Sequence, residues 1–165
     1  MSMIGEYLRL QPAELARALQ DPAWALEFAQ EIQDTEESDG SPPHEARLFS
    51  THQTWDLLGF LLRRRGFPVD IVHGEEPFTD EDWGYGPPRF LPADRVRVAA
   101  ETLSRTTYDD LVNGVHHQEL QEAGVYPLGW DTPASLDWAR DRFSLLTAFF
   151  EAAATDGDSI LLWLD

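Results

Sequence analysis

The amino-acid sequence predicts a single α+β domain over residues 1–165, in which several helices pack around a small mixed sheet. Only a few segments have the pattern of a strand, and helical segments of unequal length separate them. A regular alternation of strands and helices, which is typical of a doubly wound parallel sheet, is absent. A chain of 165 residues is also long enough to bury a substantial core without disulfides.

The first half of the chain is expected to hold one strand and three helices. Residues 3–10 alternate partly between apolar and polar side chains, which is typical of a strand. Two helices are predicted to follow, from Pro12 and from about Asp21, because each has a proline in its first turn. The acidic stretch 34–43 (DTEESDGSPP) is expected to be a solvated loop. Residues 44–65 form the most apolar helical pattern.

The middle of the chain is less regular. Residues 68–73 (PVDIVH) are expected to form a short strand, whereas residues 74–88 show no periodicity. A helix is predicted to open at Leu91–Asp94 and to bury an apolar face. Residues 108–123 form either one broken helix or two short ones.

The C-terminal part is predicted to be a long helix followed by a strand. The helix has Pro133 in its first turn, and Asp131 or Thr132 is expected to be its N-cap. Asp156-Gly157 then turns the chain. The apolar run 160–164 (ILLWL) is interpreted as a buried closing strand.

The charge of the chain excludes several classes of function. Thirty acidic residues face twelve basic ones, all of them Arg, so the net charge is −18. Such a charge repels nucleic acids and anionic membranes, so neither is expected as a partner. The absence of Lys and Cys excludes Schiff-base chemistry, Cys nucleophiles and thiolate metal sites. No secretory signal and no run of ~18 apolar residues is present, which indicates a cytoplasmic protein.

Four segments, taken in order, resemble the YfbM-like family of small bacterial proteins, a domain of unknown function. The segments are Met-x-Met-Ile-Gly-x-Tyr at the start, Thr54-Trp55-Asp56-Leu57-Leu58, the Gly84/Gly86 loop before Arg89, and Val125-Tyr126-Pro127-x-x-Trp130. The resemblance covers nearly the whole chain. It implies helices packed around a small sheet and a bacterial cytoplasmic source, and it implies no activity. One departure is Gly59, at a position where the family usually carries His.

The segment around Trp55 contains the first candidate site. On a helix, His52, Asp56, Gly59 and Arg63 fall within a stripe of roughly 60° on an otherwise apolar surface. Asp56 could then act as a ligand anchor or general base beside His52. The alternative is a buried Asp56 that caps a neighbouring backbone or pairs with Arg63 or Arg89. Gly59 indicates close approach by another group.

The aperiodic loop 74–88 contains the second candidate site. Loops of this length without secondary structure are usually functional or disordered, and its aromatic residues argue against disorder. Trp83 and Tyr85 could line the lip of a cleft and contact sugars, nucleosides or a partner's side chains. The alternative is a packed lid over core aromatics. Tyr126 and Trp130 are further ligand-binding candidates, with core packing as their alternative.

No metal site, cofactor or catalytic set is predicted. The acidic run 80–82 lacks the spacing of an EF-hand calcium loop. His116 and His117 would point about 100° apart on a helix, so they cannot face one metal together. Phosphate-binding glycine patterns and a nucleophile elbow are absent as well.

The sequence therefore favours a non-catalytic binding or interaction protein. A basic partner protein or a small polar ligand is expected, and an inhibitor or immunity-type role is one version. The alternative is a small-molecule hydrolase with a cleft around Asp56, His52 and Arg89. The ligand-binding candidates are His52, Trp55, Asp56, Trp83, Tyr85, Arg89, Tyr126 and Trp130.

Overall fold

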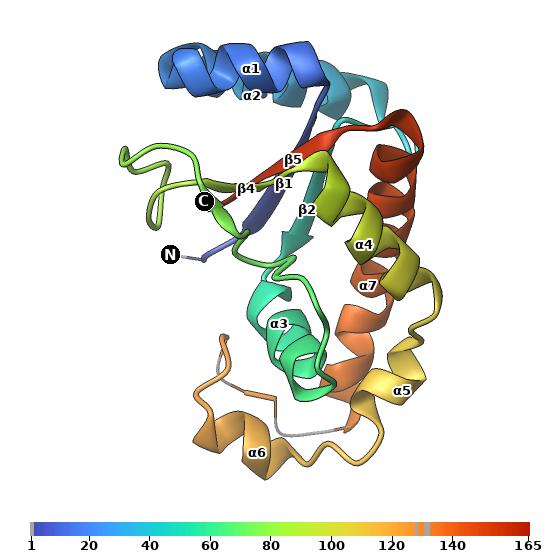
Figure 1. Ribbon diagram of the computed structural model, residues 1–165. Coiled ribbons are helices and arrows are strands. Elements are labelled where there is room, and N and C mark those ends of the chain that lie inside the picture. The colour runs from blue at the N-terminus through green and yellow to red at the C-terminus, as the bar shows by residue number, and fades with distance from the viewer. Residues whose placement is uncertain (1, 128, 131–132) are drawn as a thin grey trace.

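The structure is a computed structural model that describes residues 2–127, 129–130 and 133–165. It is an open five-stranded sheet with helices packed on both faces (Figure 1). This arrangement confirms the predicted α+β class. The sheet differs from the expectation in one respect, because every strand pairing in the described part of the chain is antiparallel rather than mixed.

The elements follow one another along the chain as strand, two helices, strand, helix, two strands, four helices and a final strand. The strands are β1 (Gly5–Leu10), β2 (Leu48–His52), β3 (Glu76–Pro77), β4 (Arg89–Leu91) and β5 (Ser159–Leu164). The helices are α1 (Pro12–Gln20), α2 (Pro22–Asp39), α3 (Trp55–Arg64), α4 (Ala93–Ser104), α5 (Tyr108–Val112), α6 (His117–Glu122) and α7 (Pro133–Asp156).

The first and last strands lie side by side in the sheet, whose order is β2-β1-β5-β4-β3. β1 pairs with β5 along its whole length, from Gly5 opposite Leu164 to Leu10 opposite Ser159. The two ends of the described chain therefore lie close together (Figure 1). The pairing of β1 with β5 thus joins the N-terminal and C-terminal segments of the domain.

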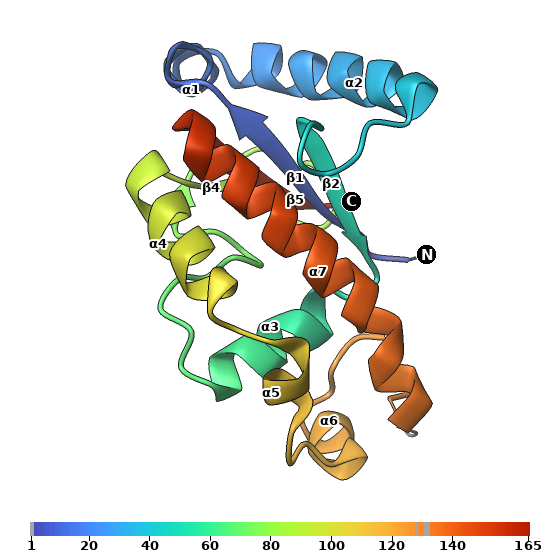
Figure 2. The same ribbon diagram turned by 90° about the vertical axis from the view of Figure 1, so that its right-hand side faces the viewer.

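The alternation of side chains along each strand creates two apolar layers. Tyr7 of β1 and Leu162 of β5 face a core that includes side chains of α3, α4 and α7. Leu8 and Leu161 face the opposite side, where they pack under α1 and α2. Figure 2 shows α7 crossing one face of the sheet and α2 lying on the other.

The predicted helix over 44–65 is wrong in its first half, which forms strand β2. Phe49 of β2 pairs with Tyr7 of β1, so tertiary pairing overrides the helical pattern. Thr54 ends the strand segment, because its backbone N–H and its hydroxyl both donate to the carbonyl of Thr51, at 3.2 and 2.7 Å. His52 consequently lies at the end of a strand and does not share a helix face with Asp56.

Two further expectations are corrected. The acidic stretch from residue 34 is helical up to Asp39, and Gly40 ends α2 in the left-handed conformation, with φ of 64°. Residues 68–73 form turns rather than a strand, because the Asp70 carboxylate accepts hydrogen bonds from the backbone of Val72 and His73. The loop from residue 74 contains the short strand β3.

The remaining predictions hold for the helices. Residues 108–123 form two short helices, α5 and α6, as one of the two alternatives stated. α4 and α7 lie where they were predicted, and β5 is buried over most of its length. The expected N-cap of α7, Asp131 or Thr132, lies outside the described residues. No helix in the described ranges is long and apolar enough to cross a membrane.

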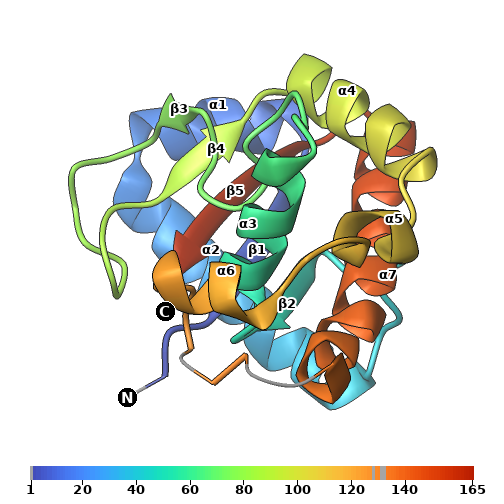
Figure 3. The same cartoon turned by 90° about the horizontal axis from the view of Figure 1, so that it is seen from below.

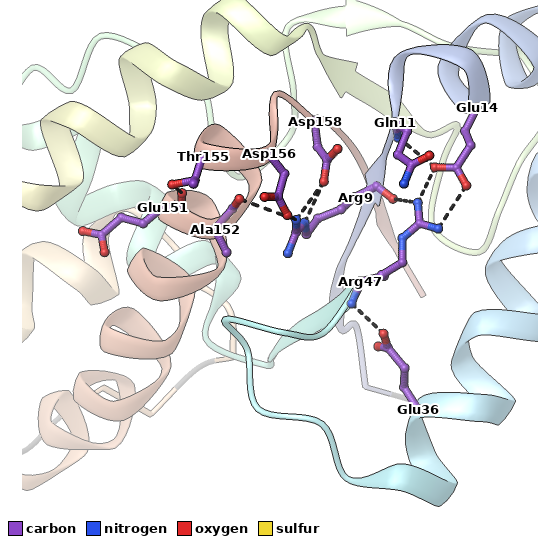
Figure 4. Close-up of polar contacts among 10 residues, drawn as sticks. All are labelled: Arg9, Gln11, Glu14, Glu36, Arg47, Glu151, Ala152, Thr155, Asp156 and Asp158. Atoms are coloured by element: carbon purple, nitrogen blue, oxygen red, sulfur yellow. Dashed lines mark hydrogen bonds and ion pairs between the residues drawn. The ribbon is translucent and has the colours of Figure 1, made fainter.

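A buried ion pair links β1 to the turn before β5. The Nε of Arg9 donates to the Asp158 carboxylate at 2.9 Å, and its Nη2 contacts Asp156 (Figure 4). Arg9 and Asp158 are only 5% and 4% exposed. A charged residue in a central strand is therefore compensated by two carboxylates, as burial of charge requires.

Replacing Arg9 with Met should lower the free energy of unfolding by about 3–5 kcal/mol, because the buried Asp158 carboxylate would lose its cation. The matched control is Arg105→Met, which removes an exposed pair with Glu101 and should cost less than about 0.5 kcal/mol. Urea denaturation at pH 7 measures both losses. Losses of equal size would contradict the structural role of Arg9.

Candidate functional site

Four of the predicted ligand-binding residues form one cluster, in which Trp55 and Asp56 of α3 meet Tyr126 and Trp130 from the segment after α6. Figure 3 shows α6 next to α3. The ring of Trp55 stacks on Tyr126 with centroids 5.5 Å apart. The Asp56 carboxylate accepts a hydrogen bond from the backbone N–H of Tyr126 at 2.8 Å. The Nε1 of Trp130 donates to the carbonyl of Tyr126 at 3.3 Å.

The N-terminal segment completes this cluster. The Nε1 of Trp55 donates to the carbonyl of Met3 at 3.0 Å, and the backbone N–H of Met3 donates to the Tyr126 hydroxyl at 2.8 Å. A Cβ atom at Gly5 would lie 2.9 Å from the Cβ of Trp55, so only glycine allows this approach. The polar groups of three of these residues thus form hydrogen bonds within the chain, namely those of Trp55, Asp56 and Tyr126. Asp56 caps a neighbouring backbone, the N–H of Tyr126, as one of the alternatives stated for it describes.

Gly59 lies under the side chain of Arg63, as the sequence indicated by predicting close approach. A Cβ at Gly59 would be 3.0 Å from the Nη1 of Arg63 and 3.3 Å from the Cγ2 of Val72. A larger residue at this position would have to displace Arg63. The glycine therefore has a packing role in α3.

The aromatic loop packs on the core instead of opening a cleft. Trp83 is 7% exposed and meets the ring of Trp163 edge-on, with centroids 5.3 Å apart. The backbone N–H of Tyr85 donates to the carbonyl of Leu164 at 3.0 Å. This is the packed-lid alternative. Tyr85 alone of the loop's predicted site residues is exposed, at 40%.

The hydrolase alternative requires Asp56, His52 and Arg89 to converge, and the geometry does not bring them together. His52 ends β2 and Arg89 begins β4, three strand spacings away, which corresponds to about 14 Å. The guanidinium of Arg89 donates to the carbonyls of Gly74 and Glu75. Asp56 is occupied by Tyr126. None of these contacts leaves a shared reactive centre.

His52 instead lies at a groove between α2 and the sheet, with a volume of about 430 Å³. Glu6 and Ser50 are opposite each other on β1 and β2, and both contribute to the groove. The residues that line it are Ile4, Glu6, Gln33, Glu36, Glu37, Ser41, Ala46, Leu48, Phe49, Ser50, His52 and Asp165. Four of these residues are acidic and none is an arginine.

Glu6 is the unusual residue of the groove. Burial and, to a smaller extent, the negative charges of Asp165 and Glu37 together raise the pKa of its carboxyl from 4.5 to about 7, against a hydrogen bond from Ser50 that lowers it. A carboxyl that titrates near neutrality is a frequent property of functional sites. Glu6 faces other acids and has no cation among the residues that line the groove.

His52, which also lines the groove, has an uncommon backbone conformation. Its φ is 53°, in the left-handed region that few residues other than glycine adopt. The backbone N–H of His52 donates to the Ser50 hydroxyl at 3.0 Å. Partial burial and the nearby charge of Arg142 lower the pKa of the His52 imidazole, which favours its neutral form.

α2 contributes two carboxylates, which differ in their hydrogen bonds. Glu36 accepts hydrogen bonds from the backbone N–H groups of Arg47 and Leu48, so it holds the start of β2. Glu37 is exposed, and its side chain accepts a hydrogen bond from Gln33 of the same helix at 3.1 Å. The last turn of α2 contains no basic residue, so the negative end of the helix dipole adds to the potential of the groove.

A second hollow, of about 680 Å³, lies beside Arg9 and Arg47. Its cations are already paired, because Arg9 contacts Asp156 and Asp158, and Arg47 contacts Glu14 and the carbonyl of Arg9 (Figure 4). The groove at Glu6 differs from this hollow because the Asp and Glu residues that line the groove have no arginine among them. In the described part of the chain, no group of three or more His, Asp or Glu side chains could hold a metal ion.

Sequence reasoning missed Glu6, Glu37 and Asp165. Two charged residues, Glu6 and Arg9, interrupt the apolar opening strand, and this was the available signal. A charge in a central strand needs a partner or a function. Glu37 and Asp165 carried no signal, because they lie far from Glu6 in the sequence.

The chain is thus a small α+β domain with an open antiparallel sheet and an acidic groove. The chain belongs to the family described as domain of unknown function DUF1877, whose model matches residues 1–163. This confirms the resemblance to YfbM-like proteins. A solved structure, a protein of unknown function, YfbM, from Escherichia coli, is similar over 98% of this chain and 99% of its own, with a TM-score of 0.66 and 16% identity. That similarity shows the fold alone. No curated protein matches the sequence.

Replacing Glu6 with Gln should remove a pH dependence of stability. The pKa of Glu6 in the folded state, about 7, exceeds its value in the unfolded state, so ionisation of Glu6 destabilises the fold. The contribution of Glu6 to the free energy of unfolding is therefore full below pH 4.5 and is lost as the pH rises through 7. The wild type should therefore lose roughly 2–3 kcal/mol more than Glu6→Gln between pH 5 and pH 8.

Urea denaturation at both pH values measures this difference. The control is Glu27→Gln on the exposed face of α2, which should behave as the wild type does. Parallel pH profiles for the wild type and Glu6→Gln would refute the assignment of the raised pKa.

Proposed function

We propose that the protein is a non-catalytic binding protein whose groove under α2 receives a basic side chain of a partner protein. Glu6 carries the proposal: its partly buried carboxyl lies in a groove lined by further acids and by no arginine. A guanidinium group would supply the missing positive charge, and its planar donors match carboxylates in pairs. An inhibitor or immunity-type role toward a basic protein is one form of this function.

The charge of the whole chain supports the same type of partner. A net charge of −18 accelerates encounter with a basic protein and disfavours acidic ones. The groove then supplies the local contact, because Ser50 and Gln33 provide hydrogen-bonding groups beside the carboxylates. A cytoplasmic location and a bacterial source belong to the same proposal and rest on the sequence features given above.

A tetra-arginine peptide with blocked ends is a suitable probe, since it carries guanidinium groups without titrating termini. Reversing a charge in the groove with Glu37→Arg should weaken its binding at least about tenfold, because a like charge replaces an attractive one. Isothermal titration calorimetry at pH 8 and moderate salt measures the Kd of each variant.

Glu27→Arg is the matched control. It makes the same change of charge on the same helix, and Glu27 does not line the groove. Its effect should stay within about threefold, since it alters only the overall charge. Equal weakening by both variants would mean that the peptide responds to net charge alone, and the proposed groove function would then be abandoned.

A further inference from the structure

We infer that the groove exchanges the proton of Glu6 for the cation of its partner, so that a proton and a guanidinium group are alternative occupants of the same carboxyl. The inference rests on the proposed function, because it concerns the same groove. In the exchange the O–H bond of Glu6 breaks, the electron pair stays on the carboxylate, and the proton passes to the solvent. No oxidant, reductant or further reactant is needed.

The surroundings of Glu6 favour this exchange. The charged and titratable groups that line the same groove are Glu36 and Glu37 from α2, His52 from β2, and Asp165 after β5. Glu36 is held by the backbone of Arg47 and Leu48. An empty groove therefore offers Glu6 only like charges, and protonation relieves the repulsion. A bound guanidinium group would relieve the same repulsion by placing a positive charge beside the ionised carboxylate.

Arg142, whose charge acts on His52 of the groove, does not pair with Glu6. Arg142 of α7 donates to the carbonyl of Ser50 at 3.2 Å and lies over the ring of Phe49. Phe49 packs with Tyr7 in the core on the α7 side of the sheet, whereas Glu6 alternates with Tyr7 on β1 and so faces α2. Arg142 is also not among the residues that line the groove.

The pH range of the exchange follows from the same environment. Because the pKa of Glu6 lies at about 7, the carboxyl is mostly protonated at pH 5.5 and mostly ionised at pH 8. If only the ionised form accepts the cation, the apparent affinity scales with the ionised fraction. The Kd for the blocked tetra-arginine peptide should then be about 30-fold higher at pH 5.5 than at pH 8.

Calorimetry of the full chain with this peptide tests the inference. At pH 6.5, titrations in two buffers of different ionisation enthalpy should show release of roughly 0.7 proton per peptide bound. Glu6→Gln should bind with a Kd close to the weak value at low pH and release almost no proton. His52→Gln should keep the release, which separates Glu6 from the imidazole in the same groove.

The outcomes distinguish the two proposals. Peptide binding that is weakened by Glu37→Arg but has no proton release, with Glu6→Gln equal to the wild type, would overturn the exchange and leave the groove as a binding site. Proton release that disappears in His52→Gln would also overturn it. Absence of binding at every pH would overturn the groove function and the exchange together.

Discussion

The pairing of the first strand with the last in the middle of the sheet is the constraint on which the rest of the structure depends. β1 lies between β2 and β5, so its residues from Gly5 to Leu8 have strand neighbours on both sides. Tyr7 goes to the core under α7, while Leu8 goes to the core under α2. The charged residues of β1, Glu6 and Arg9, have to be accommodated within the same arrangement.

The fold treats these two charges differently. Arg9 receives two carboxylates from the end of α7 and the turn before β5, which makes it part of the scaffold. Glu6 shares its groove with other acidic residues, and the pKa of its carboxyl is raised to about 7. An uncompensated charge costs stability, and natural proteins tend to retain such a cost where a site uses it. We propose that a cation of a partner protein completes the groove.

The sequence predicted the α+β class and most helices, because their caps and periodicities are local signals. It failed where pairing partners lie far apart. Residues 48–52 have an apolar pattern that suits a helix, and only the partner strand β1 makes them a strand. The ligand-binding candidates Trp55, Asp56, Tyr126 and Trp130 contact one another within the chain. Glu37 and Asp165 approach Glu6 only through the tertiary fold, so no local pattern could identify them.

The most direct test of the account is to map the bound peptide on the protein by NMR. With blocked tetra-arginine at pH 8, the account predicts that the largest amide shift changes occur at Glu6, Ser50 and Gln33, on the two walls of the groove. Changes centred instead on the aromatic loop around Tyr85, or spread evenly over the acidic surface, would contradict it.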